Sequence, residues 1–412
     1  MLCVGLLMHV FVQLGPARQA VWSVAHGRDF ASYYYATQVA SKGGDPYVTR
    51  SLSQMARSEH TRDTVLPYFY PPPFLLTVAW VQPFSLSTAY RLMLGLNELL
   101  LAGCLFVLVR GFSIPLGVVG ALLIVWSPIP DNAKMGQANL IALFPALLGL
   151  WAARTRPWLG GVLLGAAAMF KMSPALFLLY WALRRQWKPC VGAIGAAIGL
   201  TLISLAYCPL PTQVEFYTRV MPGFASGDYY GLTVPISLAA NHSIPDIFNT
   251  LWPGPSKTAL SSTALVGSRV VTLGVLALWA WRARIPRSPL AEARTLGALT
   301  ILMVIVPTYA YEHHLVFLLL PVAALLTSVQ RDWLAGEGFR PRHGLAIASV
   351  LLAGWPLTQV TELVNRLPPS AQLLAREGKF VGLLMILGLL LLSWRPGAVA
   401  GASPQPAATD DG

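Results

Sequence analysis

Long apolar blocks recur along this chain of 412 residues, and they constrain its fold more than any other feature. Charged residues make up only 11% of the sequence, against about 25% in an ordinary soluble protein. The apolar residues come in continuous runs rather than at the period of an amphipathic helix or strand. This pattern predicts a multi-pass membrane protein and excludes a cytosolic enzyme, a nucleic-acid binder and a disordered scaffold. The blocks lie approximately at Tyr68–Leu86, Leu92–Val109, Ile114–Ile129, Leu140–Ala153, Trp158–Leu183, Val191–Cys208, Leu260–Trp281, Leu296–Tyr309, Leu315–Val329, Leu345–Leu357 and Phe380–Trp394.

The predicted fold is an all-α, polytopic transmembrane bundle of about 10–12 spans or half-spans, since not every block needs to cross completely. We expect one domain over residues 1–395. The opening run from Leu2 to Leu14 is short for a span, and we interpret it as a first anchor with a truncated or misassigned start at Met1. A cleaved signal peptide is the alternative interpretation. The tail at residues 396–412 is rich in Ala, Pro, Gly and Asp and is predicted to be disordered.

Two long polar stretches, residues 16–67 and 209–256, interrupt the apolar blocks and are too long to be simple turns. The net charge of +12 is interpreted as the basic residues of cytoplasmic loops. Counting alternate crossings from these loops places both polar stretches, and the segment Tyr309–His314, on the outer face. The basic clusters are Arg184, Arg185 and Lys188; Arg282, Arg284 and Arg287; Arg331, Arg340 and Arg342; and Arg395.

The stretch between Arg110 and Arg184 does not fit strict alternation, which places Arg154 and Arg156 outside. Treating Ile114–Ile129 and Trp158–Leu183 as re-entrant broken helices brings both arginines inside. Only Arg110 is then left on the unexpected side. This interpretation also places residues 131–139 and Lys171 toward the outer face.

Asp29 is a candidate general base because it lies immediately after the first span, where the chain enters the outer loop. A carboxylate beside aromatic residues at the membrane surface is partly desolvated and can accept a proton from a hydroxyl group. The alternative is that Asp29 caps the start of an amphipathic helix, with Tyr33–Tyr35 as an interfacial belt.

Lys171 and Glu98 are ionisable residues inside apolar blocks, where such groups are costly unless they face a cavity or a partner. Lys171 is about a dozen residues from either end of its block, which makes snorkelling to the surface difficult. Pro174 predicts a break in the helix nearby, and broken backbone at membrane depth lines a cavity. A phosphate is a suitable partner for Lys171. Glu98 is expected either to have a role in a functional site or to pair with a residue of a neighbouring helix.

Two further groups of polar side chains lie at the outer ends of apolar segments. Gln137 and Asn139 can donate to sugar hydroxyls or to phosphate, or can join helices. Glu312 precedes His313 and His314, and a histidine beside a carboxylate suits contact with phosphate or hydroxyl groups. The two adjacent histidines point in different directions, so a metal shared between them is not expected.

No metal or other cofactor is predicted, because the sequence contains no DxD, HxxxH or paired-cysteine motif. A soluble nucleotide is not supported as a direct substrate either, since the sequence contains no P-loop and no GxGxxG motif. Asn241–Ser243 matches a glycosylation sequon, which often occurs by chance. The four cysteines, Cys3, Cys104, Cys190 and Cys208, are interpreted as small packing residues.

Short motifs occur in a characteristic order from about Asp29 to Leu320. They are Asp29-Phe30, Tyr33-Tyr34, Gly44-Asp45-Pro46-Tyr47, Tyr70-Pro71-Pro72, Gly136-Gln137-Ala138-Asn139, Lys171-Met172-Ser173-Pro174 and Glu312-His313-His314-Leu315. Each motif is weak alone, but the ordered set resembles glycosyltransferase family 87. This resemblance implies the C-type glycosyltransferase fold and a polyprenyl-phosphate-mannose-dependent α-mannosyltransferase activity at the outer face of the membrane.

The resemblance also implies roles for individual residues. Asp29 matches the acidic residue that acts as the base, and transfer then proceeds with inversion. The residues expected around the donor phosphate, the sugar and the acceptor are Tyr33, Tyr34, Gln137, Asn139, Lys171, Glu312, His313 and His314. The implied partners are a polyprenyl-phosphate sugar, a glycolipid or glycan acceptor of the cell envelope and the lipid bilayer, with no nucleic acid. The implied location is the inner cell membrane, with the active site facing the periplasm or exterior.

The sequence departs from the family pattern in its abbreviated first span and in Ser237–Asn241, which leaves the acceptor undetermined. A transporter or lipid flippase is the main alternative, because it also has broken helices and buried charges. A noncatalytic assembly partner is the third. An enzyme is expected to bring Asp29, Lys171 and His313 around one cavity, whereas a noncatalytic partner would leave Asp29 exposed and distant from the other two.

Overall fold

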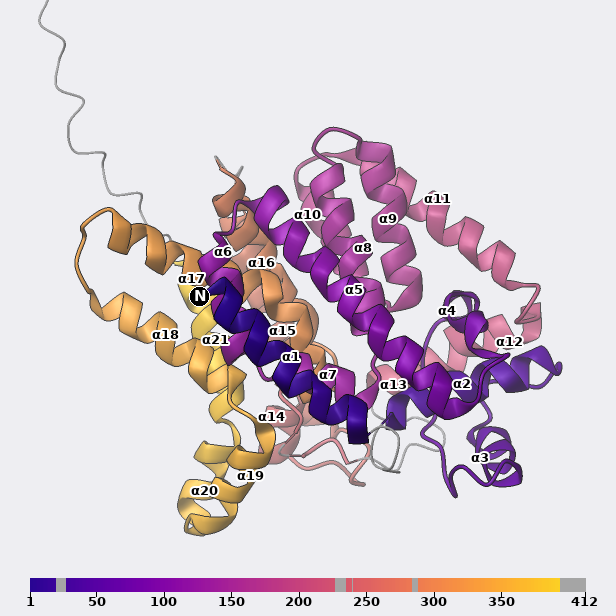
Figure 1. Ribbon diagram of the computed structural model, residues 1–412. Helices are drawn as coiled ribbons and strands as arrows, with labels where there is room; N and C mark the ends of the chain where they lie inside the picture. Colours follow the sequence, from indigo (N-terminus) through magenta and orange to yellow (C-terminus); the bar gives the residue numbers. More distant parts are fainter. Residues whose placement is uncertain (20–26, 227–234, 239, 284–287, 393–412) are drawn as a thin grey trace, which may run out of the picture.

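The computed structural model describes residues 1–19, 27–226, 235–238, 240–283 and 288–392, and it is a bundle of helices (Figure 1). Within this described part, no β-strand is present apart from two isolated bridges. The predicted all-α fold is therefore confirmed. The tail that the sequence predicts to be disordered lies outside the described residues. The helices are α1 (Leu2–Gln19), α2 (Arg28–Ser41), α3 (Thr49–Ser58), α4 (Pro72–Val78), α5 (Leu86–Phe112), α6 (Leu116–Val125), α7 (Pro128–Met135), α8 (Asn139–Ala152), α9 (Pro157–Phe170), α10 (Phe177–Leu183), α11 (Trp187–Ser204), α12 (Leu210–Glu215), α13 (Met221–Ser226), α14 (Ile244–Leu251), α15 (Ser262–Arg282), α16 (Pro289–Ile305), α17 (Leu319–Leu334), α18 (Pro341–Gly354), α19 (Leu357–Arg366), α20 (Pro369–Arg376) and α21 (Gly378–Leu391), with short turns η1 (Ala79–Val81), η2 (Ser173–Leu176), η3 (Phe216–Val220) and η4 (Glu312–Leu318).

Four helices in the described part are long and apolar enough to cross a membrane. They are α5, α11, α15 and the continuous helix formed by η4 and α17. The pair α6 and α7 would be a fifth span if counted as one. Several shorter apolar helices, among them α8, α9 and α21, have 10–17 residues each, fewer than a full crossing needs.

Two apolar blocks are broken, as the sequence predicts. In the block Trp158–Leu183, α9 ends at Phe170 and Lys171 has extended backbone, with φ −152° and ψ 124°. Pro174 then lies in η2, before α10 begins. In the other block, α6 and α7 meet at an angle of 60°. Pro174 has no backbone N–H group, so it cannot donate the hydrogen bond that a continuous helix would need there.

The block Tyr68–Leu86 contains only a half-length helix. The apolar helix covers Pro72–Val81, where α4 is followed by η1. Ten residues of helix extend about 15 Å, half of the apolar thickness of a bilayer. The next helix, α5, therefore begins on the same side of the bundle as the polar stretch before α4.

The cavity described below lies where two apolar cores meet. The larger core surrounds the η4–α17 helix, which is packed by α16, α6, α18 and α21. The smaller core is rich in aromatic residues and holds α2 against α4 through ring contacts such as Tyr33–Phe74, whose centroids are 5.3 Å apart. Figure 1 shows α3, α14 and α20 toward the lower end of the bundle, so the two polar stretches and the segment before α21 share that end.

Several residues that the sequence singles out lie away from this cavity, and the structure shows what each of them contacts. Glu98 pairs with His9 of α1, with 2.7 Å between the carboxylate oxygen and Nε2, so its pairing alternative is confirmed. Asn241 is buried, and its side chain bonds to the backbone at Ile236, Thr308 and Ala310, which leaves the amide unavailable for glycosylation in this fold. All four cysteines are free.

Candidate active site

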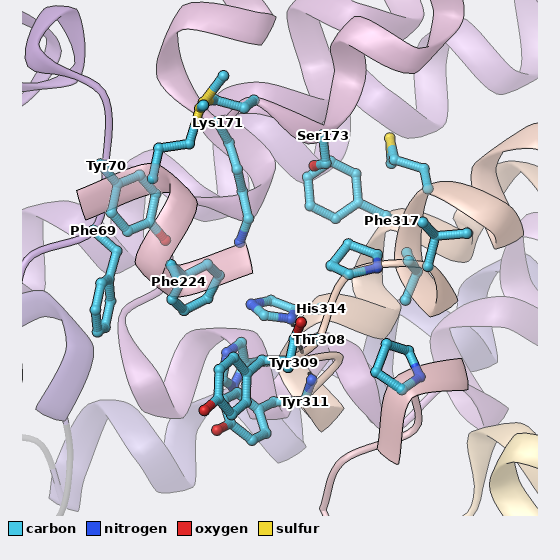
Figure 2. Close-up of a pocket in the computed structure, with 18 of the residues that line it drawn as sticks. Phe69, Tyr70, Lys171, Ser173, Phe224, Thr308, Tyr309, Tyr311, His314 and Phe317 are labelled. Atoms are coloured by element: carbon cyan, nitrogen blue, oxygen red, sulfur yellow. Dashed lines mark hydrogen bonds between the residues drawn. The ribbon is translucent and has the colours of Figure 1, made fainter. Parts of the chain in front are cut away.

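One cavity, with a volume of about 620 Å³, contains most of the polar residues that the sequence singles out. Its walls are largely aromatic and aliphatic (Figure 2). The charged and hydrogen-bonding side chains on its wall include Asp29, Tyr33, Tyr70, Gln137, Lys171, Arg269, Thr308, Tyr311, His313 and His314. An apolar cavity with a few convergent polar groups is typical of a ligand site.

Asp29 lies in the first turn of α2, with its side chain 16% exposed. The N-cap of α2 is Gly27, at φ 65° and ψ 29°, so the interpretation of Asp29 as the N-cap is wrong. Gly27 donates its backbone N–H to Lys134 O at 2.9 Å, which fixes the start of α2 against α7. This attachment directs the Asp29 carboxylate into the cavity instead of toward the free N–H groups of its own helix.

Gln137 connects the groups around Asp29. Its amide nitrogen donates to the Asp29 carboxylate and, at 3.0 Å, to His313 Nε2. Its amide oxygen accepts from the hydroxyls of Tyr33, at 3.0 Å, and Tyr70, at 2.9 Å. We assign the amide in this orientation because a carboxylate cannot donate a hydrogen bond when it is ionised.

Burial raises the pKa of the Asp29 carboxyl above its ordinary value of 3.8. The hydrogen bond from Gln137 acts in the opposite direction, as does the positive charge of Lys171. A carboxylate with a raised pKa is a stronger base than a solvated one. Its surroundings therefore suit proton abstraction near neutral pH.

The backbone before Gln137 requires glycine. Gly136 follows α7 with φ 65°, a conformation that other residues rarely adopt. A Cβ atom there would lie 2.7 Å from the Phe30 Cβ and 2.8 Å from the Tyr90 ring. The turn therefore brings Gln137 close to the start of α2, beside Asp29.

Lys171 lies at the break between α9 and η2 and points into the cavity toward His314 (Figure 2). Its Nζ atom donates to Asn139 Oδ1 at 2.6 Å. It also lies 5.6 Å from the ring centre of Tyr70 and 5.8 Å from that of Phe317. No ion pair joins Lys171 to a carboxylate in the described part of the chain, so its charge is available to a bound anion.

Asn139 does not line the cavity, but it links two groups that do. Besides accepting from Lys171, it donates to the backbone oxygen of His313 at 2.8 Å. Another hydrogen bond, of 3.0 Å, joins it to Asn132 in α7. Asn139 therefore positions Lys171 and His313 relative to each other.

His313 and His314 begin the buried η4–α17 helix and both face the cavity. The Nε2 atom of His313 lies 4.0 Å from the Asp29 carboxylate. His314 Nδ1 accepts the backbone N–H of Tyr311 at 3.2 Å, so we assign the hydrogen of its neutral ring to Nε2. That nitrogen can donate to an oxygen atom of a ligand.

Two predicted contact residues lie outside the cavity wall. Glu312 is buried behind it, 2.5 Å from Lys379 Nζ and 3.2 Å from His242 Nε2. Tyr34 donates its hydroxyl to the backbone oxygen of Phe84 at 2.9 Å. The structure thus brings Asp29, Tyr33, Gln137, Lys171, His313 and His314 to one cavity, with Asn139 beside them, and leaves Glu312 and Tyr34 out.

Sequence reasoning missed Arg269 and Lys379. Arg269 lines the cavity from α15 and is the only charged residue of the block Leu260–Trp281, a signal that does indicate function in a membrane segment. Lys379 is 1% exposed, but it directly precedes an apolar block in the sequence and gives no such signal. Among the described residues, no group of three or more His, Cys, Asp or Glu side chains could hold a metal ion.

The geometry bears on the arrangements expected of an enzyme and of a noncatalytic partner. Asp29, Lys171 and His313 line the same cavity, as an enzyme was expected to arrange them. Asp29 is largely buried and close to His313, so the noncatalytic alternative, with an exposed and distant Asp29, is wrong.

The sequence model of glycosyltransferase family 87 matches residues 68–307, more than half of this chain. The chain is 27% identical over 256 residues to a polyprenol-phosphate-mannose-dependent alpha-(1-2)-phosphatidylinositol mannoside mannosyltransferase of Mycolicibacterium smegmatis, covering 60% of this chain and 53% of that protein. It is 26% identical over 314 residues to a polyprenol-phosphate-mannose-dependent alpha-(1-2)-phosphatidylinositol pentamannoside mannosyltransferase of Mycobacterium tuberculosis, covering 72% and 64%. An alpha-(1->3)-arabinofuranosyltransferase of Mycobacterium tuberculosis is 25% identical over 281 residues, covering 61% and 60%.

The alignments span about half to two thirds of the length of these curated relatives. No solved structure is found to match the chain.

Proposed function

Because this chain belongs to glycosyltransferase family 87, we propose that it transfers a hexose, mannose, from a polyprenyl-phosphate donor to a lipid-linked or cell-envelope glycan acceptor. The observation that carries this proposal is the convergence of Asp29, Gln137, Lys171 and His313 in one largely apolar cavity. Curated relatives whose names specify polyprenol-phosphate-mannose dependence support mannose as the sugar. The arabinofuranosyltransferase relatives make a pentose the second candidate.

The cavity has separate surfaces for the two chemical parts of such a donor. Aromatic and aliphatic side chains such as Phe69, Phe224 and Met303 offer an apolar surface to the isoprenoid. The Lys171 ammonium group and the His314 ring offer hydrogen-bond donors to the phosphodiester. Electrostatic contacts of this kind are strong in a site that excludes water.

The proposed reaction is a single displacement. Asp29 removes the proton from an acceptor hydroxyl while the hydroxyl oxygen forms a bond to the anomeric carbon. The bond from that carbon to the phosphate oxygen breaks, and its electron pair leaves with polyprenyl phosphate. Lys171 stabilises the negative charge that develops on the departing phosphate. The configuration of the anomeric carbon is therefore inverted, and the proton remains on Asp29 until it is released to solvent.

We assign the active site to the outer face of the inner cell membrane. The half-length helix Pro72–Val81 supports this orientation, because it does not reverse the side of the chain as a full span would. With α5 starting outside, Arg110 at its other end joins Arg154, Arg156 and Arg184 on the cytoplasmic side. This count takes α6 and α7 together as one crossing, in place of the re-entrant segment that the sequence suggested, and keeps residues 131–139 on the outer face. The one basic residue that the sequence left on the unexpected side is thereby accounted for.

The test is transfer of radiolabelled mannose from polyprenyl phosphate mannose in membranes that contain the native chain or Asp29→Asn. We expect the variant to lose at least about a hundredfold in turnover, because a positioned base contributes about 10²–10⁴ to the rate. Asp63→Asn, which changes an exposed carboxylate in the outer loop, is the matched control and should keep full activity. Equal turnover for the native chain and Asp29→Asn would remove Asp29 from the mechanism.

A further inference from the structure

One face of α15 lines the cavity and differs from the rest of that helix. Leu265, Ser268, Arg269 and Thr272 line the cavity, at the spacing of residues that share a helical face. α15 packs against α14 and α16. Much of its surface is unburied, and Val266, Val270 and Leu273 are exposed, as expected for a helix that contacts lipid. The helix therefore separates the cavity from the bilayer.

Arg269 has a position that requires a partner. It is exposed and lies seven residues after the start of α15 at Ser262, or about 10 Å along the helix axis. An arginine within a membrane segment is costly unless it reaches the interface or a counter-ion. Among the described residues, no hydrogen bond or ion pair of its guanidinium group is found. The guanidinium is thus free to bind a ligand.

Lys171 and Arg269 are on different walls of the cavity. Lys171 follows α9 and is joined through Asn139 to the group that contains His313. Its charge also acts on Asp29. The phosphate of the proposed donor must lie at the reacting carbon, close to these groups. Arg269, on the lipid-facing wall, is then a second cationic position for which the donor supplies no second phosphate.

We propose that Arg269 binds the phosphate of an anionic lipid acceptor whose acyl chains remain in the bilayer beside α15. This inference rests on the proposed function and defines the acceptor class. The planar guanidinium group makes paired hydrogen bonds to phosphate oxygens, which fixes a headgroup more firmly than an ammonium group does. Its depth of about 10 Å below the helix start places the extended side chain near the headgroup level. The acceptor sugar can then extend from the phosphate into the cavity toward Asp29.

The experiment measures transfer to two acceptors with the same mannose, a phosphatidylinositol mannoside and a neutral dialkylglycerol mannoside. With Arg269→Gln, we expect KM for the anionic acceptor to rise about tenfold or more, since a charged hydrogen bond is lost. The kcat value, KM for the donor and KM for the neutral acceptor should change by less than about threefold, which is within the effect of a weak contact. Arg269→Lys should recover part of the affinity because it keeps the charge. Arg110→Gln, in the last turn of α5, is the control for loss of an exposed arginine. Its kcat and its KM for both acceptors should equal those of the native chain.

A second measurement does not depend on transfer. Binding of phosphatidylinositol and of diacylglycerol to the purified chain in nanodiscs should show a preference for the anionic lipid in the native chain and not in Arg269→Gln. If the native chain does not transfer mannose but this preference depends on Arg269, the proposed function fails while the anionic-lipid site stands. A rise in KM for the polyprenyl-phosphate donor in place of the acceptor would overturn the inference and assign Arg269 to the donor. Unchanged acceptor KM and unchanged lipid preference would show that Arg269 only reaches the interface.

Discussion

Lys171 and Lys379 both lie in apolar surroundings, but they have different partners. Lys379 Nζ lies 2.5 Å from the Glu312 carboxylate and donates to Ala353 O at 3.2 Å. Lys171 donates to an uncharged amide and faces the cavity. The comparison indicates that a lysine with a buried carboxylate partner holds helices together, whereas a lysine held by an amide leaves its amino group available to a ligand. The two lysines therefore predict different losses when each is removed.

The largest expected effect is on stability. Lys379→Met leaves Glu312 buried with only His242 and a distant hydroxyl as partners, and breaking a buried pair costs about 3–5 kcal/mol. We expect a marked fall in the melting temperature of the detergent-purified protein. The double variant with Glu312→Gln should recover most of the loss, because no unpaired charge then remains. A single variant as stable as the native chain would contradict the structural role of this pair.

The next effect is on transfer and not on stability. Lys171→Met should lower kcat by about a hundredfold, as removal of one strong electrostatic contact to a transition state does. Because Lys171 has no carboxylate partner in the described part of the chain, the melting temperature should stay equal to or above that of the native protein. Steady-state kinetics and thermal unfolding on the same preparation measure both. Loss of stability equal to that of Lys379→Met would show that the two lysines do not differ as proposed.

The smallest effect is a shift in pH dependence. Gln137→Leu removes the hydrogen bond that lowers the pKa of Asp29, so burial then raises this pKa further. The base is active when deprotonated, and the acid limb of the kcat/KM profile should therefore move to higher pH. Gln54→Leu, on the exposed face of α3, is the control and should leave the profile unchanged. If the maximum kcat/KM falls but the acid limb of the profile stays at the same pH, Gln137 acts only in folding.

Part of the candidate site follows from local sequence signals. Pro174 predicts the helix break beside Lys171, and a glycine at position 136 suits the left-handed turn that the structure shows before Gln137. Both signals act through backbone geometry within a few residues, which is why they can be read from the sequence. Arg269 has a comparable signal, since a single charge in a long apolar block indicates function by itself.

Other features depend on partners distant in the sequence. Glu312 and His313 are adjacent, yet side chains at neighbouring positions of a 3-10 helix project about 120° apart. Glu312 meets Lys379 and His242, whereas His313 meets Gln137. Nothing in the motif Glu312-His313-His314 tells which of its members faces the cavity.

The sequence by itself determined the membrane class, the all-helical bundle and the helix breaks, because these depend on composition, block length and local backbone restrictions. Only the tertiary structure decided that Gln137 joins Asp29 to His313, that Lys171 faces the cavity with no carboxylate partner among the described residues, and that Glu312 belongs to the packing behind it. The physical reason is that a hydrogen bond or ion pair depends on distance and direction between side chains, and those are fixed only when helices far apart in the chain pack together.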